Sequence, residues 1–157
     1  MNDRVHAHVH LAVAGAFPLR VADVLFTEDE LVVTEYEYLT PLDIARGRVH
    51  EAGKQARERV RESGPADLVA AAERTHRLGY ADLERVRLYE SGPGRPKLAV
   101  DPAVGPPYAY RIHAPVDLEA LAGTLRPLGD RQNFEVTVAS ALGFSPVNGL
   151  RRFLADR

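Results

Sequence analysis

Hydrophobic and polar positions alternate most regularly in residues 21–39, VADVLFTEDELVVTEYEYL. A period of two places successive side chains on opposite faces of a β-strand, so this stretch predicts two strands. Acidic residues at 28–30 interrupt the apolar run, and Pro41 ends the second strand because proline has no N–H to donate to a sheet ladder. The bend contains no glycine, which favours a loop longer than a two-residue primed turn. We therefore expect a central hairpin.

The second strand of this hairpin has one aromatic and one acidic face. Tyr36 and Tyr38 share one side of the pleat, and Glu35 and Glu37 share the other. Because ionised carboxylates are costly to bury, we expect these glutamates to lie in water and the tyrosines to be buried. An isolated hairpin is only marginally stable in water, so the remaining chain must cover it.

Other strands are predicted on both sides of the hairpin. Residues 5–14, VHAHVHLAVA, alternate in the same way, and Gly15 and Pro18 break the chain after them. Four further short runs read as strands: 84–90, 96–101, 108–114 and 134–139. Glycine and proline separate the first three of these, a punctuation that is typical of an antiparallel meander.

Helical periodicity marks the remaining stretches. Charged residues, with small apolar residues every fourth position, fill residues 43–78 and predict two surface helices separated by Ser63-Gly64-Pro65. An amphipathic helix ended by Gly129 is predicted at about 116–128, with one apolar face formed by Leu118, Leu121, Ala122, Leu125 and Leu128. A last short helix is predicted after Pro146.

Length and composition narrow the possible functions. A chain of 157 residues is expected to form a single domain, 1–157, with a helical insertion at 43–78 and a C-terminal extension at 141–157. It has no cysteine, which excludes disulfides, thiol catalysis and cysteine-bound metals, and its net charge of −2 indicates no nucleic-acid partner. Without a signal region or an apolar run of roughly 20 residues, we expect a soluble cytoplasmic protein with no integral membrane segment.

The order of elements resembles the pleckstrin-homology-like superfold in its prokaryotic and GRAM-type versions. Residues 23–44, DVLFTEDELVVTEYEYLTPLDI, are similar to the family's pattern of threonine and turn, apolar strand and Pro-Leu-x-x-Ile. Residues 108–128, YAYRIHAPVDLEALAGTLRPL, are similar to its last strand and plugging helix. The resemblance implies an α+β fold, in which an antiparallel curved sheet or partly open barrel is plugged by the helix at about 116–128. A helical insertion at about 43–77 and a C-terminal strand plus helix are additions to that pattern.

The resemblance also implies a function, namely binding of a phosphoinositide, a peptide or a partner protein, usually without catalysis. Lipid-binding members have a basic first hairpin, whereas Glu28, Asp29 and Glu30 stand at that position here, so a phosphoinositide ligand is not supported. We expect a non-catalytic binding or assembly module that associates with a protein partner or with itself.

Three histidines near the N-terminus, His6, His8 and His10, are the first candidate site. On a strand they share one face, with neighbours about 7 Å apart. Two imidazoles at that spacing can bind a divalent metal if a further ligand, usually a carboxylate, comes from elsewhere in the chain. The alternative function is therefore a hydrolase-like, metal-dependent enzyme; otherwise no cofactor is expected. The competing interpretation is a polar, solvent-facing strand face, because no carboxylate pattern in the sequence points to these histidines.

The second candidate site is cationic. Arg95 and Lys97 follow a Gly-Pro-Gly turn, and Arg111 and His113 lie near the end of a strand, where they could bind an anion. A hairpin tip that is merely polar is the competing interpretation. The arginines of the helical insertion alternate with glutamates and favour a self-neutralised surface. The sequence contains no nucleophile elbow, phosphate loop or dinucleotide fingerprint, so no catalytic residue is assigned.

Overall fold

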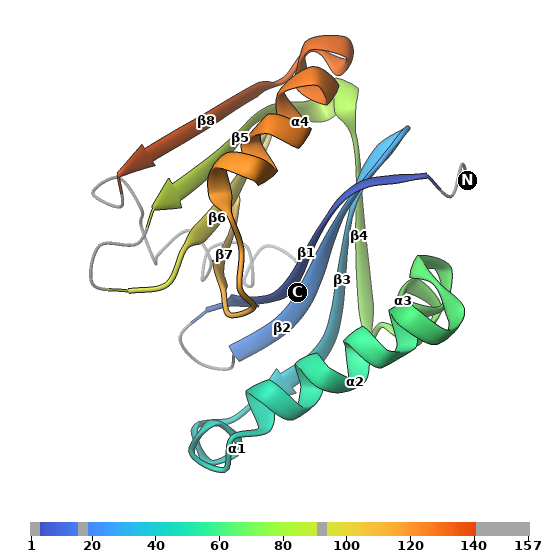
Figure 1. The fold of residues 1–157 in the computed structure, drawn as a ribbon, viewed down its shortest axis with the longest axis vertical. Helices are drawn as coiled ribbons and strands as arrows, with labels where there is room; N and C mark the ends of the chain where they lie inside the picture. The colour runs from blue at the N-terminus through green and yellow to red at the C-terminus, as the bar shows by residue number, and fades with distance from the viewer. Residues whose placement is uncertain (1–3, 16–18, 91–93, 141–157) are drawn as a thin grey trace.

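The computed structural model describes residues 4–15, 19–90 and 94–140, which form one eight-stranded sheet and four α-helices (Figure 1). The strands are β1 (Val5–Ala14), β2 (Leu19–Thr27), β3 (Glu30–Leu39), β4 (Arg74–Gly79), β5 (Leu83–Glu90), β6 (Lys97–Pro102), β7 (Tyr108–Ile112) and β8 (Glu135–Ser140). The helices are α1 (Pro41–Ala45), α2 (Arg48–Ser63), α3 (Pro65–Ala71) and α4 (Leu118–Gln132), with a 3₁₀ turn, η1, at Tyr80–Asp82.

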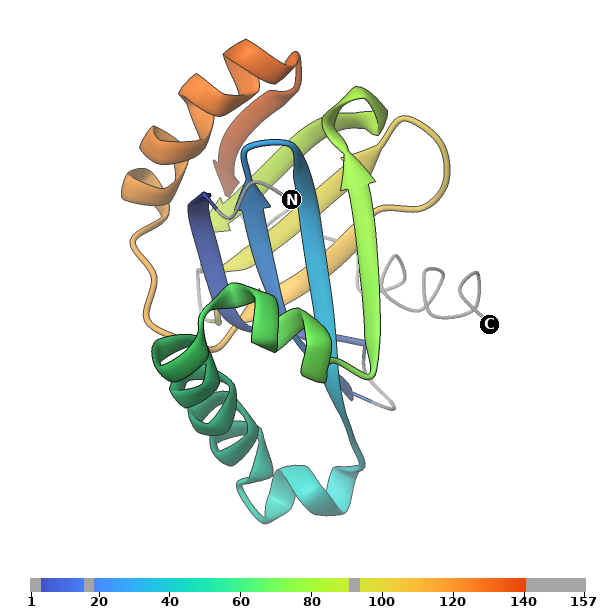
Figure 2. The same cartoon turned by 90° about the vertical axis from the view of Figure 1, so that its right-hand side faces the viewer.

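Two antiparallel meanders, β1 to β4 and β5 to β7, make up most of the sheet, whose order is β4-β3-β2-β1-β7-β6-β5-β8. They join where β7 pairs with β1, with Ala12 opposite Ile112 and Val13 opposite Arg111. The sheet is strongly curved, with α4 against its inner face and α2 and α3 lying across its outer face (Figures 1 and 2). The α+β class, with a curved sheet covered by an amphipathic helix, is thus confirmed.

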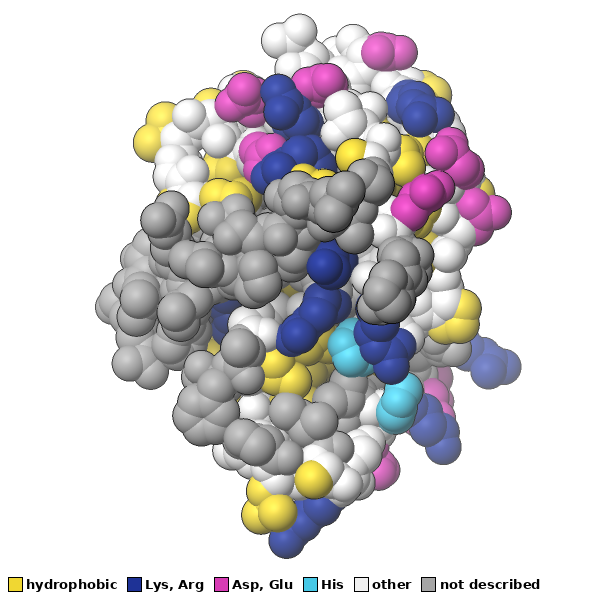
Figure 3. Space-filling view, turned by 90° about the vertical axis from the view of Figure 1, so that its left-hand side faces the viewer, with side chains coloured by type: hydrophobic (Ala, Val, Ile, Leu, Met, Phe, Trp, Pro, Cys, Tyr) yellow, Lys and Arg dark blue, Asp and Glu magenta, His cyan; other side chains and the backbone are white. Residues whose placement is uncertain are grey.

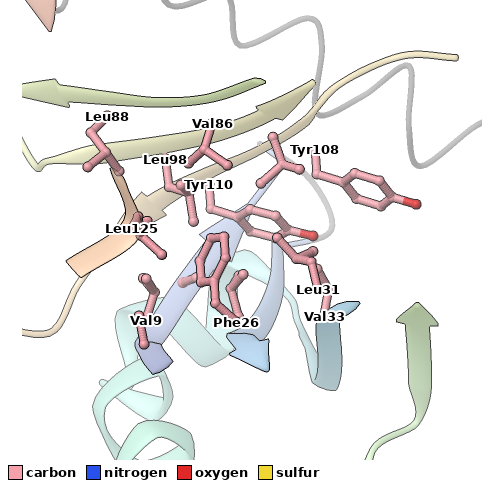
Figure 4. Packing of buried hydrophobic residues seen from close by; sticks show 14 of the residues in the cluster. Val9, Phe26, Leu31, Val33, Val86, Leu88, Leu98, Tyr108, Tyr110 and Leu125 are labelled. Carbon is pink, nitrogen blue, oxygen red and sulfur yellow. The ribbon is translucent and has the colours of Figure 1, made fainter. Parts of the chain in front are cut away.

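The main core lies between the inner face and α4. Leu118 and Leu125 of α4 are buried there, Leu121 packs against the same cluster, and every strand from β1 to β3 and from β5 to β7 contributes apolar side chains. Figure 4 shows Leu125 facing Val9 and Leu88, with Phe26 and Tyr110 close by. Burying such side chains contributes about 1.5–3 kcal/mol each, so this contact is the principal reason that the sheet stays folded over the helix.

Helix α4 continues past its predicted end. The Asp117 carboxylate caps its N-terminus by accepting a hydrogen bond from the Ala120 N–H at 3.0 Å. Gly129, expected to end the helix, is instead buried within it, where an added Cβ would lie 2.5 Å from the Phe134 carbonyl oxygen. The helix ends at Gln132, and its C-cap, Asn133, turns the chain toward β8 with a left-handed φ of 64°. The glycine thus serves close packing.

Two further details of the expected secondary structure are corrected. The second helix of the insertion begins at Pro65 as predicted but ends at Ala71, and Arg74–Gly79 forms the edge strand β4. Pairing with β3 wins over helical propensity there, because it lets Leu78 pack against the main core. The last strand, β8, is present but adds to β5 in parallel. The predicted extension at 141–157, with its helix, lies outside the described residues.

The hairpin of β2 and β3 forms as predicted, but the expected division of β3 into a solvent-exposed acidic face and a buried aromatic face is wrong. The last paired residues at the bend are Phe26 and Leu31, and a register shift between Val21 and Ala22 leaves an extra residue in β3. Glu35 is fully buried rather than wet, because Arg20 on β2 reaches its carboxylate at 3.0 Å. Tyr36 and Tyr38 are only partly buried.

Among the described helices, none has the length and apolar character needed to cross a bilayer.

Candidate functional site

A bulge in β1 sets the geometry of the site. The register with β2 shifts between Val9 and Ala12, and Leu11 takes a left-handed φ of 53°, which is uncommon for a residue with a branched side chain. Val9 packs into the inner core before the bulge and Ala12 does so after it, so the alternation reverses. As a result His10 and Leu11, although consecutive, both line the outer face.

Asp23 of β2 lies opposite this bulge and collects four hydrogen bonds. His8 Nε2 is 2.6 Å and His10 Nδ1 2.9 Å from its Oδ2 atom. The Leu11 backbone N–H donates to Oδ1 at 2.9 Å, and the Tyr36 hydroxyl donates to Oδ1 at 3.2 Å. The histidine–aspartate cluster, as we call His8, His10 and Asp23, therefore gathers two imidazoles and one carboxylate from adjacent strands.

The carboxylate of this cluster is ionised at neutral pH. Complete burial by itself would raise the pKa of Asp23, but the hydrogen bonds from His10 and His8 and their charges outweigh it, so the pKa falls to about 2. The His8 and His10 rings lie edge to face, with centroids 5.7 Å apart. The buried anion thus holds both rings in place.

His6, the third predicted metal ligand, lies apart from the other two. Its Nε2 atom is 2.5 Å from Glu28 at the bend between β2 and β3, and this hydrogen bond is the main reason that the pKa of Glu28 is lowered. Arg131 of α4 approaches the same carboxylate at 3.9 Å. The structure therefore brings together two of the three histidines with an aspartate that the sequence analysis missed. A lone carboxylate within the apolar strand LRVADVLFT was the available signal.

Beside the cluster, a pocket of about 390 Å³ opens between β1, α2 and the segment that follows β7. Its lining residues are His10, Leu11, His50, Lys54, His113, Ala114 and Pro115. The His113 backbone N–H donates to the Leu11 carbonyl at 2.9 Å, which ties the segment after β7 to the bulge. The described residues that line this pocket include a lysine and three histidines but no carboxylate.

The surroundings of this pocket are strongly positive. The pKa of His113 falls to about 4, first because the ring is half-buried and then because Arg95, Arg111 and His50 repel its protonated form. Arg95 donates to the His113 carbonyl at 3.4 Å, and Lys97 stands opposite Arg111 on the neighbouring strand. Of the four residues predicted as an anion site, His113 lines the pocket, Arg95 and Arg111 lie near it, and Lys97 is the strand partner of Arg111.

Figure 3 shows this character on one face of the molecule. Lysine, arginine and histidine side chains lie together over the middle of the face, whereas acidic side chains lie mainly toward its top and right-hand edges. The described side chains at the middle of this face therefore offer an anion positive charge.

A second buried polar group lies on the inner face. Besides Arg20, the Glu35 carboxylate meets the Tyr38 hydroxyl at 3.4 Å and His76 at 3.7 Å. Burial alone would raise the pKa of Glu35, but the neighbouring His76 and Arg20 side chains lower it. Glu35 and Arg20 are both almost completely buried, so this ion pair serves the packing of the sheet and offers no surface to a ligand.

Comparison with known proteins identifies no family. No family model and no curated protein matches the chain. Among solved structures, it is similar to the hSac2 domain from the human phosphoinositide phosphatase Sac2, with a TM-score of 0.52 and 10% sequence identity over 90% of this chain and 80% of that one. At this identity the similarity shows a shared fold only.

Proposed function

We propose that this chain is a non-catalytic binding module with a pleckstrin-homology-like core, and that its pocket holds a small anion or an anionic group of a partner. The observation that supports this most is the lining of the pocket, where Lys54 and three histidines meet without a carboxylate among the described lining residues. Arg95 and Arg111 add positive charge at its rim.

The neighbouring Asp23 does not cancel this attraction. Both of its oxygens already accept hydrogen bonds, from His8 and His10 on one side and from Leu11 and Tyr36 on the other. A carboxylate or phosphate in the pocket could instead take hydrogen bonds from the Lys54 ammonium and the imidazole N–H groups. Charge-assisted hydrogen bonds of this kind are about twice as strong as neutral ones.

A phosphoinositide headgroup stays outside this proposal, because the first hairpin still presents Glu28, Asp29 and Glu30 where lipid-binding relatives of the superfold have basic residues. Association with a protein partner or a second copy remains part of it, since an acidic side chain of a partner offers the same carboxylate chemistry. No basic surface suited to nucleic acid is invoked, since the net charge is −2.

To test this, the full chain is titrated with inorganic phosphate and with acetate. Calorimetry measures the affinity, and amide NMR shows which residues respond. We expect saturable shifts at residues 10–11, 50–54 and 113–115, and about tenfold weaker binding in Lys54→Ala. Arg85→Ala is the matched control, because Arg85 is paired with Glu135 on the β5–β8 side of the sheet. Equal binding by wild-type protein and Lys54→Ala, or shifts confined to other regions, would contradict the proposal.

A vesicle-binding experiment tells whether the pocket binds a free anion or a lipid headgroup. If the pocket takes a free or protein-borne anion, retention on vesicles containing phosphatidylserine should equal retention on neutral phosphatidylcholine vesicles. Salt-sensitive retention on the anionic vesicles alone, lost in Lys54→Ala, would assign the site to membranes instead.

A metal-dependent enzyme is the second candidate function, since His8 and His10 converge on a carboxylate at the wall of a pocket. It requires an ion at the histidine–aspartate cluster, so metal binding is its first test.

A further inference from the structure

We infer that His8, His10 and Asp23 form a binding site for one divalent transition-metal ion of the Zn²⁺ class. His8 Nε2, His10 Nδ1 and a carboxylate oxygen of Asp23 all lie within 4.8 Å of one another. Two imidazoles and one carboxylate are the protein ligands that zinc and non-haem iron take in sites that keep positions open for water or another ligand.

The site is held in shape by groups that would not touch the ion. The Asp23 Oδ1 atom is occupied by the Leu11 N–H and the Tyr36 hydroxyl, which leaves Oδ2 turned toward both imidazoles. Ligating carboxylates are oriented in this way by outer hydrogen bonds in known metal sites. The left-handed backbone of Leu11, an uncommon conformation for that residue, exists at the point where its N–H reaches the carboxylate.

A purely structural role for the cluster is the competing explanation, because a buried aspartate needs donors in any case. Access distinguishes the two. His10 forms part of the pocket wall and the His8 side chain is 25% exposed, so an ion can reach the nitrogens from solvent. The pocket side also leaves room for water or an anion as a further ligand. This inference rests on the cluster itself and does not depend on the proposed anion-binding function.

The strand supplies a matched control for the test. His6 is on the same strand as His8 and His10, but it bonds to Glu28 outside the cluster. The protein is purified without a histidine tag, stripped with a chelator and titrated with Zn²⁺ by calorimetry and with Co²⁺ by visible absorption. We expect one ion per chain, and His6→Ala should change the affinity by less than about threefold.

Removal of a ligand should have a much larger effect. His8→Ala, His10→Ala and Asp23→Asn should each weaken Zn²⁺ binding by more than about 100-fold, while Tyr36→Phe should weaken it by about 10–100-fold through the lost outer hydrogen bond. Binding that is equally weakened by His6→Ala, or that survives in the His8→Ala/His10→Ala double variant, would identify adventitious uptake and overturn the inference. So would the absence of binding by wild-type protein at millimolar Zn²⁺.

A measurement on the wild-type protein guards against variants that fail to fold. Zn²⁺ should shift the imidazole ¹⁵N resonances of His8 Nε2 and His10 Nδ1 and leave those of His6 unchanged. Shifts at His6, or at His50 and His113 alone, would contradict the site. Phosphate binding by the metal-free protein is measured in parallel. It tests the anion proposal independently of metal binding, so failure of one can be told from failure of the other.

Discussion

Leu11 carries the local strain on which the cluster depends. Its φ of 53° costs a residue with a side chain about 1–2 kcal/mol, yet the residue is only 5% exposed and packs in a cluster with Val13, Val21 and Leu39. The hydrogen bond from its N–H to Asp23 offsets part of that cost. The residue therefore combines an unfavourable backbone with favourable packing.

This combination predicts that, contrary to the usual order, the glycine variant at this position is more stable than the alanine variant. Both Leu11→Ala and Leu11→Gly lose the packing, but glycine tolerates the left-handed backbone, so Leu11→Gly should be the more stable of the two by about 1 kcal/mol. Val13, buried on the same strand, is the control: there Val13→Ala should be the more stable one. Urea unfolding of the four variants measures both differences. A normal order at Leu11 would show that its backbone is not left-handed in solution.

Asp23 predicts a loss of stability in acid. Because its pKa is about 2 in the folded protein and 3.8 otherwise, its contribution is complete above about pH 4 and is lost as the pH falls toward 2. Asp23→Ala should cost about 3–5 kcal/mol at pH 7, since it leaves buried donors without their acceptor. The measurement is urea unfolding of metal-free protein at several pH values. Asp130→Ala, at an exposed position on α4, is the control and should change stability by less than about 0.5 kcal/mol.

His113 reports the positive potential of the pocket. Its pKa of about 4, against 6.5 ordinarily, means that the unfolded chain takes up a proton that the folded one refuses, so stability falls as the pH drops from about 6.5 to 4. NMR titration of the His113 ring should show the low pKa directly. Arg95→Ala, or bound phosphate, should raise it. A pKa that neither change moves would mean that burial alone sets it.

At the scale of elements, two glycines in α4 predict opposite effects of the same substitution. Gly129→Ala should destabilise by about 1–3 kcal/mol, because the new methyl group meets the Phe134 backbone. Gly123 lies on the exposed side of the same helix with nothing within 4 Å of an added Cβ, so Gly123→Ala should stabilise by about 0.5–1 kcal/mol. Thermal and urea unfolding measure both. Equal effects would argue that α4 does not pack against β8 as described.

The helical insertion contributes to the pocket through α2. Most of the described side chains of α2 are exposed, and His50 and Lys54 are the ones that reach the pocket. Thin packing of this kind is typical of segments that open at low free energy. The helix thus acts as a wall of the site rather than as part of the main core.

At the scale of the whole molecule, we expect the outer helix α2 to open at a lower free energy than the buried sheet. Amides of α2 should exchange with solvent several orders of magnitude faster than those of β2, which is buried along its whole length. Saturating phosphate should slow exchange in α2, which supplies His50 and Lys54 to the pocket, and leave α4 unchanged, because α4 packs on the opposite face. Hydrogen exchange followed by mass spectrometry tests this. Uniform protection of both helices would indicate global stabilisation instead.

Local periodicity determined which segments of this chain form strands and helices. Alternation in residues 21–39 and the leucines from Leu118 to Leu128 depend only on neighbours in sequence, and both predicted elements are present. The curved sheet covered by an amphipathic helix was expected because the order of these elements resembles a known superfold. Arg95, Lys97, Arg111 and His113 were candidates from the sequence, and local pairing of β6 with β7 places Lys97 opposite Arg111.

Only the tertiary structure decided which polar residues meet. Asp23 joins His8 and His10 because a bulge at Leu11 shifts the register. The sequence does not reveal this shift, because residues 11–14 are all apolar and show no alternation. Glu35 is buried because the Arg20 guanidinium reaches its carboxylate, and Gly129 sits inside a helix because Phe134 leaves no room for a side chain. Each of these outcomes depends on a partner distant in sequence or on close packing. The alternation of hydrophobic and polar residues along the chain gives no information about either.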